Sequence, residues 1–387
     1  MKIKKVELFH LEIPFNMSFG HSKAKRDKTD NFICKTTLKD ETVGWGEGIP
    51  REYVTGETHD LFISGFNFYL NSLGNVSPES LEELVNVLKQ QEVIGDSKFV
   101  GTSSKCCLEL SLLDAYGKYF NKSISEIGKY LGFSDNNEIN TTYSSVIGSG
   151  NIRGAIERIE MGRIVKIKDF KIKLGQKNDI RKLKKIYKKF EQEIASKEMR
   201  IRGDVNSGWD LEQAQKIMPL LAEYGLCYIE DPLKDNCQQD YKELTQNSAV
   251  PIMFDEPLRT VTEAEKFIKY NMCNGFDIRI SKNGGLIDSL KIARLAKDNG
   301  IDCQVGCMVG ETGILSAAGR HLIYCVEPIF AEGSYGNILL ENDIIKEELT
   351  LTIGGKIGKL TESGLGITIK ERQFNKYSNK VLERGIS

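Results

Sequence analysis

The chain has 387 residues, with 53 Lys and Arg against 54 Asp and Glu, and a formal net charge of −1. This balance provides no overall field that would attract nucleic acid or an anionic membrane, so we expect neither as a partner. The length allows more than one domain, and a single barrel domain could contain most of it.

The first segment, MKIKKVELFHLEIPF, has basic clusters but no apolar stretch of signal length, and no uncharged run approaches membrane-spanning length. We therefore expect a cytoplasmic protein. The nine cysteines are scattered and odd in number, which indicates no disulfide framework. Cys303 and Cys307 straddle a predicted strand end, but buried free thiols are a better interpretation than a zinc site.

Residues 1–135 predict an α+β domain. Strand-like segments at 2–13, 31–39 and 41–48 are followed by helical periodicity at 80–91 and 105–120. We expect this part of the chain to form a cap.

Residues 136–340 predict an eight-unit barrel. Amphipathic helical stretches, several ending on Gly, separate eight strand candidates, which lie at 139–146, 170–175, 200–205, 226–231, 251–256, 276–281, 301–306 and 328–333. The predicted fold class is α/β: a modified (β/α)8 TIM-type barrel with an α+β capping domain. Residues 341–387 return to short strand-like pieces at 349–360 and 364–369 and then a basic tail, and we expect them to pack on the cap.

Four charged residues recur at the interval expected for the strand-plus-helix units of a barrel. Asp204, Glu230, Asp255 and Arg279 lie 26, 25 and 24 residues apart, each at the end of a short apolar run. Barrel enzymes carry function at the C-terminal ends of their strands, so the three acids should converge. Converging carboxylates repel one another unless a cation lies among them, and their hard oxygens suit Mg²⁺, with Mn²⁺ also possible. Helix capping or pairing with lysines could explain one acid, but explains three on consecutive strands less well.

Upstream, Lys171 and Lys173 are two residues apart in one strand and therefore share a face, which we expect to be the barrel interior. Like-charge proximity and desolvation both lower the pKa of a lysine, so one of the pair could act as a general base. A surface strand with solvated lysines is the alternative.

The ordered motifs K-I-K, D-V-N, I-E-D-P, F-D-E-P, K-N-G-G and G-E-T-G resemble the enolase superfamily, in its muconate-lactonizing and dipeptide-epimerase branch. Further similarity in V-G-W-G-E-G, P-R-E-Y-V-T-G-E-T and S-G-L-G-I extends over the length of the chain. The resemblance implies that Mg²⁺ holds a substrate carboxylate, a barrel base removes the α-proton, and the metal stabilises the enediolate.

The resemblance also implies roles for individual residues. Lys173 would be the base, and Lys171 would lower its pKa. The metal ligands would be Asp204, Glu230 and Asp255, and Asn206 and Glu256 would orient them.

One departure changes the expected reaction. Epimerases of this branch carry a second lysine at the position of Arg279, and arginine does not readily abstract protons. Arg279 could instead hold a substrate carboxylate, which favours a one-base reaction. Lys282, three residues later, remains a second candidate for the base on that side.

The last strand ends and the cap supply the expected substrate contacts. Glu311 follows an extra residue, Gly310, and Glu332 could replace the missing D-x-D that would hold a substrate ammonium group. In the cap loops the candidates are His21, Arg26, Arg51 and Tyr53, each of which could equally pack a loop.

The main functional hypothesis is a one-base cycloisomerase or a dehydratase or other lyase, acting on a small carboxylate. The alternative is an N-acyl amino acid racemase or dipeptide epimerase that uses Lys173 and Lys282. A non-enzyme alternative is a carboxylate-binding protein that has lost catalysis, although such a protein has no need for three repelling carboxylates. We expect a homo-oligomer, as many barrel enzymes are.

Overall fold

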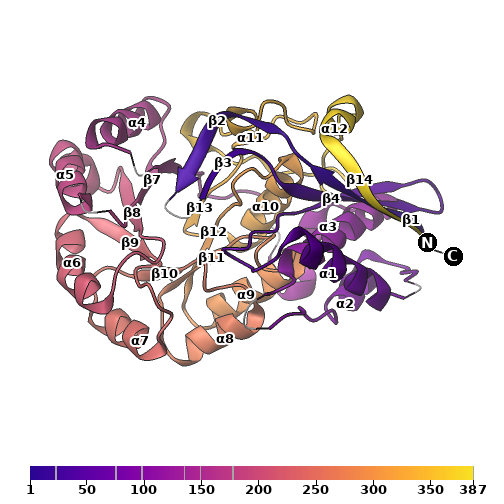
Figure 1. Cartoon of the computed structure of the whole chain (residues 1–387), viewed down its shortest axis with the longest axis horizontal. Helices are drawn as coiled ribbons and strands as arrows, with labels where there is room; N and C mark the ends of the chain where they lie inside the picture. Colours follow the sequence, from indigo (N-terminus) through magenta and orange to yellow (C-terminus); the bar gives the residue numbers. More distant parts are fainter. Residues whose placement is uncertain are drawn as a thin grey trace.

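The computed structural model describes residues 1–21, 24–74, 76–96, 99–134, 136–148, 150–176 and 178–386. These residues form an eight-stranded sheet, a four-stranded sheet and a two-stranded hairpin. In Figure 1 the eight-stranded sheet and its helices make up the left lobe, and the four-stranded sheet lies with α1, α2 and α3 on the right. None of the described helices is long and apolar enough to cross a membrane.

The larger sheet is the predicted barrel. Its strands are parallel and lie in chain order: β6 (Ser145–Ile147), β7 (Asp169–Lys173), β8 (Arg200–Asp204), β9 (Leu226–Glu230), β10 (Ile252–Phe254), β11 (Gly275–Ile278), β12 (Asp302–Val305) and β13 (Phe330–Ala331). Tyr143, just before β6, forms a parallel bridge with Ala331, and Ser144 N donates to Ala331 O over 2.8 Å. The first and last strands therefore meet, and the predicted fold class is confirmed.

A helix follows each barrel strand, and all but the short last one, which lies beside β2 (Pro14–His21), cover the outside of the sheet (Figure 1). The helices are α4 (Ile152–Ile164), α5 (Asp179–Ala195), α6 (Leu211–Glu223), α7 (Gln238–Asn247), α8 (Val261–Lys269), α9 (Leu286–Asp298), α10 (Gly313–Val326) and the short α11 (Gly336–Leu339). Local sequence sets several of their starts. Asp210 and Thr260 each accept a bond from the backbone three residues later, in capping boxes that open α6 and α8.

The cap contains an antiparallel sheet in the order β14-β1-β4-β5. Its elements, with the adjoining hairpin and helices, are β1 (Ile3–Leu11), β2 (Pro14–His21), β3 (Ala24–Lys28), β4 (Asn31–Leu38), β5 (Val43–Gly48), α1 (His59–Ser72), α2 (Leu81–Leu88), α3 (Thr102–Tyr119) and the 3-10 helix η1 (Ile124–Leu131). The glycines of V-G-W-G-E-G allow α3 to lie directly on β5. A Cβ on Gly46 would be 2.2 Å from the Cys107 carbonyl oxygen, and one on Gly44 would be 2.2 Å from Ala115 N.

The end of the chain differs from the expected pattern. Residues 349–360 contain the 3-10 turn η2 (Ile353–Gly355), and 364–369 contribute only isolated bridges. Strands at both places were wrongly predicted. Glycines with positive φ, such as Gly354 at 76° and Gly364 at 68°, turn the backbone out of an extended path. The strand comes from the basic tail, where α12 (Glu371–Tyr377) leads into β14 (Ser378–Gly385), which pairs with β1.

Candidate active site at the barrel mouth

Charged side chains gather at the C-terminal ends of adjacent strands. Lys173 ends β7, Asp204 ends β8 and Glu230 ends β9, and the parallel register places Lys173 opposite Asp204 and Asp204 opposite Glu230. Asp255 directly follows β10, and Arg279 directly follows β11. The barrel thus brings all five to one end of the sheet.

The predicted metal ligands Asp204, Glu230 and Asp255 are all buried. Glu230, Asp255 and Asp277 each offer one oxygen, and these oxygens lie within 4.8 Å of one another. Asp204 is turned toward the lysines, because both Lys173 and Lys171 form ion pairs with it. Asp277 was not predicted, although its position two residues before Arg279 puts both on the same face of β11.

Burial and neighbouring charges shift the pKa values of these carboxyl groups in different directions. Burial raises the pKa of Glu230 to about 8, helped by the charge of Asp204 and opposed by Lys171. Burial also raises the pKa of Asp277, to about 6. For Asp204 burial acts in the same direction, but the charges of Lys173 and Lys171 outweigh it and lower the pKa. Burial therefore favours the protonated forms of Glu230 and Asp277, whereas the two lysines favour the ionised form of Asp204.

This donor set fits a hard divalent cation. Buried carboxylate oxygens from consecutive strands are the ligands that Mg²⁺ and Mn²⁺ favour. A bound cation would oppose both the burial and the acid–acid repulsion that raise the pKa of Glu230 and Asp277. Glu230 and Asp255, with Asp204 or Asp277, are the residues that could hold it.

The two lysines of β7 have different surroundings. Lys171 Nζ lies 3.1 Å from Glu230 Oε1 and 2.9 Å from Glu332 Oε2. Burial lowers the pKa of Lys171, but the charges of Glu230, Glu332 and Asp204 outweigh it and raise the pKa well above its ordinary value. Lys173 is 14% exposed, pairs with Asp204, and donates to Asn206 Oδ1 over 3.1 Å.

Arg279 and Lys282 both reach Asp255 from the opposite side of the barrel. The Arg279 guanidinium contacts the Asp255 carboxylate and is 13% exposed. Lys282 is fully buried, and its Nζ lies 2.8 Å from Asp255 Oδ1, 2.6 Å from Asp255 O and 2.8 Å from Asp277 O. Burial and the charge of Arg279 lower the pKa of Lys282 to about 7. Although this pKa would suit a base, three protein oxygens enclose the Lys282 nitrogen. The Arg279 guanidinium is partly exposed and can therefore contact a substrate.

Hydrogen bonds hold the acids in place. Asn206 N donates to Asp204 Oδ1 over 3.0 Å, and Asn206 Nδ2 donates to Glu256 Oε1 over 3.1 Å. The buried Asp231 accepts from the backbone N of Asp255 (3.1 Å) and of Glu256 (2.8 Å). Asn206 and Glu256 thus lie where they could orient the ligands, and Asp231 adds a contact that was not predicted.

Glu311 and Glu332 line a small cavity with Tyr143 and Ser281. Glu311 accepts from Met308 N over 3.2 Å and from Ser316 Oγ over 3.3 Å, and burial raises its pKa to about 8. Glu332 instead pairs with Lys171 and with the unpredicted Arg202. Burial raises the pKa of Glu332, but these two cations outweigh it and lower the pKa to about 2.

The four substrate-contact candidates predicted in the cap have different surroundings. His21 ends β2, but its side chain lies outside the described residues. Arg26 in β3 lies 3.6 Å from Asp30 Oδ2, and Tyr53 is half-buried. Arg51 is buried and donates to the backbone oxygens of Asp30, Pro50 and Val309 over 3.0, 2.8 and 3.2 Å. These are contacts that pack the cap on the β12–α10 loop, so a substrate contact of Arg51 stays a prediction.

Other residues of the site could have been found from strand alternation. Arg202 is two residues before Asp204, and Gln304, in the middle of β12, donates to Glu230 Oε2 over 3.3 Å. Side chains at alternate positions face the same side of a strand. Once the residue at a strand's end is known to face the site, the residue two positions earlier is expected to point inward as well.

Comparison with known proteins gives a consistent result. A family model described as Enolase C-terminal domain-like matches residues 153–373. An L-Ala-D/L-Glu epimerase from Francisella tularensis subsp. novicida is 28% identical over 323 residues, covering 82% of this chain and 86% of that protein. The solved N-succinyl Arg/Lys racemase from Bacillus cereus aligns over 100% of both chains with a TM-score of 0.84 and 21% identity. A dipeptide epimerase from Cytophaga hutchinsonii, solved with Mg and D-Ala-L-Val, has a TM-score of 0.82 and 21% identity over 98% of this chain and 99% of that one.

Proposed function

Because this chain belongs to the Enolase C-terminal domain-like family, in the muconate-lactonizing and dipeptide-epimerase branch of the enolase superfamily, we propose that it removes and returns the α-proton of a dipeptide or N-acylated amino acid. The reaction would be an epimerisation or racemisation that requires Mg²⁺. The chain itself is an enzyme of the isomerase or lyase class.

The observation that carries this proposal is the position of Lys173 beside the buried acids of β8 and β9. As a neutral amine, Lys173 would accept the proton that leaves the substrate α-carbon, and as an ammonium group it would return a proton to that carbon. Bound Mg²⁺ would neutralise the second negative charge that develops on the substrate carboxylate as the proton leaves. Asn206, 3.1 Å from Lys173 Nζ, would hold the lysine in this position.

The relatives support the substrate class. The name of the Francisella protein is that of an L-Ala-D/L-Glu epimerase, and the Bacillus protein is an N-succinyl-L-Arg/Lys racemase that is 25% identical over 378 residues. Both names describe amino acid derivatives with a free α-carboxylate. The comparisons thus support the epimerase and racemase hypothesis more than the cycloisomerase hypothesis favoured from the sequence.

A second candidate remains because of Arg279. An epimerase must handle a proton on both faces of the α-carbon, and the side opposite Lys173 presents an arginine to the site while Lys282 is enclosed by three oxygens. Arginine keeps its proton near neutral pH. A one-base cycloisomerisation or elimination would need only Lys173 as base and a fixed positive charge on the other side.

The test is α-proton exchange in D₂O with Mg²⁺, measured by mass spectrometry across dipeptides, N-acyl amino acids, hydroxy acids and unsaturated diacids. Label in both stereoisomers of a dipeptide or N-acyl amino acid is the expected result. Label in one stereoisomer only, or turnover of another acid class, would favour the one-base candidate.

Lys173→Ala should lower exchange by about 10²- to 10⁴-fold, the usual contribution of a general base. Lys185→Ala removes a lysine from the exposed face of α5 and serves as the matched control. Exchange by wild type that persists in Lys173→Ala would contradict the proposed role of Lys173.

A further inference from the structure

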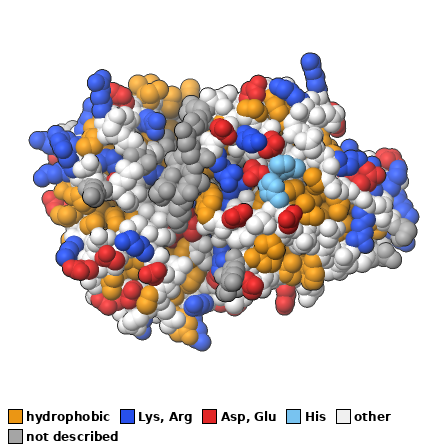
Figure 2. Space-filling model, viewed as in Figure 1, with side chains coloured by type: hydrophobic (Ala, Val, Ile, Leu, Met, Phe, Trp, Pro, Cys, Tyr) orange, Lys and Arg blue, Asp and Glu red, His pale blue; other side chains and the backbone are white. Residues whose placement is uncertain are grey.

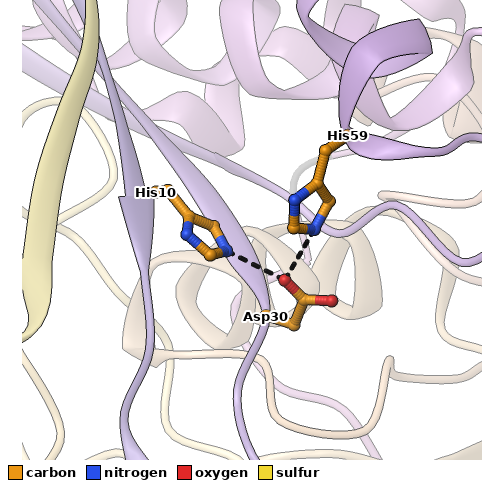
Figure 3. Close-up of side chains that lie close together, drawn as sticks. All are labelled: His10, Asp30 and His59. Carbon is orange, nitrogen blue, oxygen red and sulfur yellow. Dashed lines mark hydrogen bonds and ion pairs between the residues drawn. The ribbon is translucent and has the colours of Figure 1, made fainter.

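Three titratable side chains of the cap form a cluster that contains none of the barrel acids. His10 lies in β1, Asp30 links β3 to β4, and His59 is the first residue of α1. His10 Nε2 lies 2.9 Å from Asp30 Oδ1, and His59 Nε2 lies 2.7 Å from the same oxygen. Figure 3 shows the two rings pointing from different elements toward this one carboxylate.

Packing and charge fix the directions of these groups. The two imidazole rings lie 4.8 Å apart between centroids, and each lies 5.2 Å from the ring of Phe32. The second oxygen of Asp30 faces Arg26 Nη1 at 3.6 Å, and its backbone carbonyl accepts from Arg51 over 3.0 Å. Arg26 therefore faces the oxygen that points away from the histidines, and Arg51 fixes the backbone of Asp30, in the way that outer partners orient the ligands of a metal.

The chemistry of this set differs from that of the barrel. Two imidazole nitrogens and one carboxylate oxygen lie within 4.8 Å of one another. Imidazole suits Zn²⁺, Co²⁺ and Ni²⁺, whereas Mg²⁺ prefers a shell made of oxygen. The His59 side chain is 48% exposed, and histidine atoms are visible beside acidic atoms on the face drawn in Figure 2. Water can therefore complete the coordination.

We propose that His10, Asp30 and His59 form a second metal site, which binds a divalent transition-metal ion of the Zn²⁺ or Co²⁺ class. The ion would connect β1, the β3–β4 link and α1. In the structure, these elements are joined by the hydrogen bonds of His10 and His59 to Asp30 Oδ1. It would stabilise the cap without taking part in the reaction of the barrel. The positive charges of Arg26 and Arg51 should moderate its affinity.

The test is a titration of the metal-free full-length protein with Co²⁺ while excess Mg²⁺ occupies the barrel. Co²⁺ bound by histidine absorbs visible light, so wild type should show a saturating band at one equivalent, and Zn²⁺ should abolish the band. His59→Gln and Asp30→Asn should each lower Co²⁺ affinity by at least about tenfold. Asp204→Asn, which alters the barrel acids, should keep the band.

Thermal unfolding provides a second readout. Zn²⁺ should raise the Tm of wild type but not that of either cap variant, with folding of each checked by circular dichroism. The proposal is overturned if wild type binds no Co²⁺ in excess Mg²⁺, or if a folded cap variant binds Co²⁺ as tightly as wild type. If His59→Gln does not fold, Asp30→Asn decides by the same criteria.

Discussion

The ammonium group of Lys171 lies 2.9 Å from the carboxylate of Glu332, across the seam where the barrel closes. Lys171 belongs to β7 and Glu332 follows β13, with only β6 between them. Arg202 from β8 forms a second ion pair with the same carboxylate. Glu332 therefore already balances two buried cations, and the substrate ammonium group expected at this position would have to compete with them.

This relationship predicts a large effect on stability. Arg202→Met leaves Glu332 with a single cationic partner and should lower the free energy of unfolding by about 3 to 5 kcal/mol, as for other buried pairs that lose one member. The double variant Arg202→Met/Glu332→Leu should recover part of this loss. Denaturant unfolding is the measurement. Arg294→Met, which removes the exposed pair with Asp298, should cost about 1 kcal/mol or less and is the control. Equal costs in the two single variants would contradict the prediction.

Arg279→Lys should change the stereochemistry of exchange. A lysine at this position can take up and release protons near neutral pH, which an arginine cannot. We expect label on the face opposite Lys173 to increase relative to label on the Lys173 face, measured in D₂O with each stereoisomer supplied separately. Arg279→Gln removes the charge without supplying a base and is the control. An unchanged ratio in Arg279→Lys would mean that this side chain does not face the α-carbon.

Divalent cations should stabilise the fold through the barrel acids. Mg²⁺ or Mn²⁺ at about 100 times its Kd should raise the free energy of unfolding by about 2.7 kcal/mol, because it binds the folded chain only. Glu230→Gln should abolish most of this gain, whereas Glu212→Gln, 78% exposed on α6, should not. Unfolding with and without a chelator measures the difference. A full gain in Glu230→Gln would place the cation elsewhere.

Glu109 should make stability depend on pH. It is buried in α3 and accepts from Ile287 N over 3.1 Å, and burial raises its pKa to about 7, against the charge of Lys105. The folded chain therefore holds an extra proton between the ordinary pKa of 4.5 and about 7. The contribution of Glu109 to the free energy of unfolding therefore falls as the pH rises through this window, and it stays low at higher pH.

Glu109→Gln should remove this dependence, because the amide cannot ionise and can still accept from Ile287. At pH 8 the variant should be more stable than wild type by up to ~3 kcal/mol, and at pH 4 the difference should vanish. Denaturant unfolding at several pH values measures both. Glu82→Gln, on the exposed face of α2, is the control, and a wild-type slope in the Glu109→Gln variant would refute the assignment.

The order of strands and the ends at which charge gathers were predictable because both follow from local patterns. Apolar runs at intervals of about 25 residues predict β/α units, and such units can close into a barrel. Arg279, at the end of the sixth barrel strand, also stood out by its spacing alone. Strands at 349–360 and 364–369 were predicted wrongly, because alternation there competes with glycines that take positive φ, and β14 forms only because β1 offers an edge for pairing.

By itself, the sequence determined the barrel class, the acids at consecutive strand ends and the pair of lysines, since each depends on periodicity along the chain. The tertiary structure alone decided which charges meet. The closing seam brings Glu332 to Lys171, the turn after β11 encloses Lys282 while Arg279 reaches the site, and the cap brings His10 and His59 to Asp30. These contacts join residues far apart in the sequence, and their energies depend on burial and distance, which no local pattern contains.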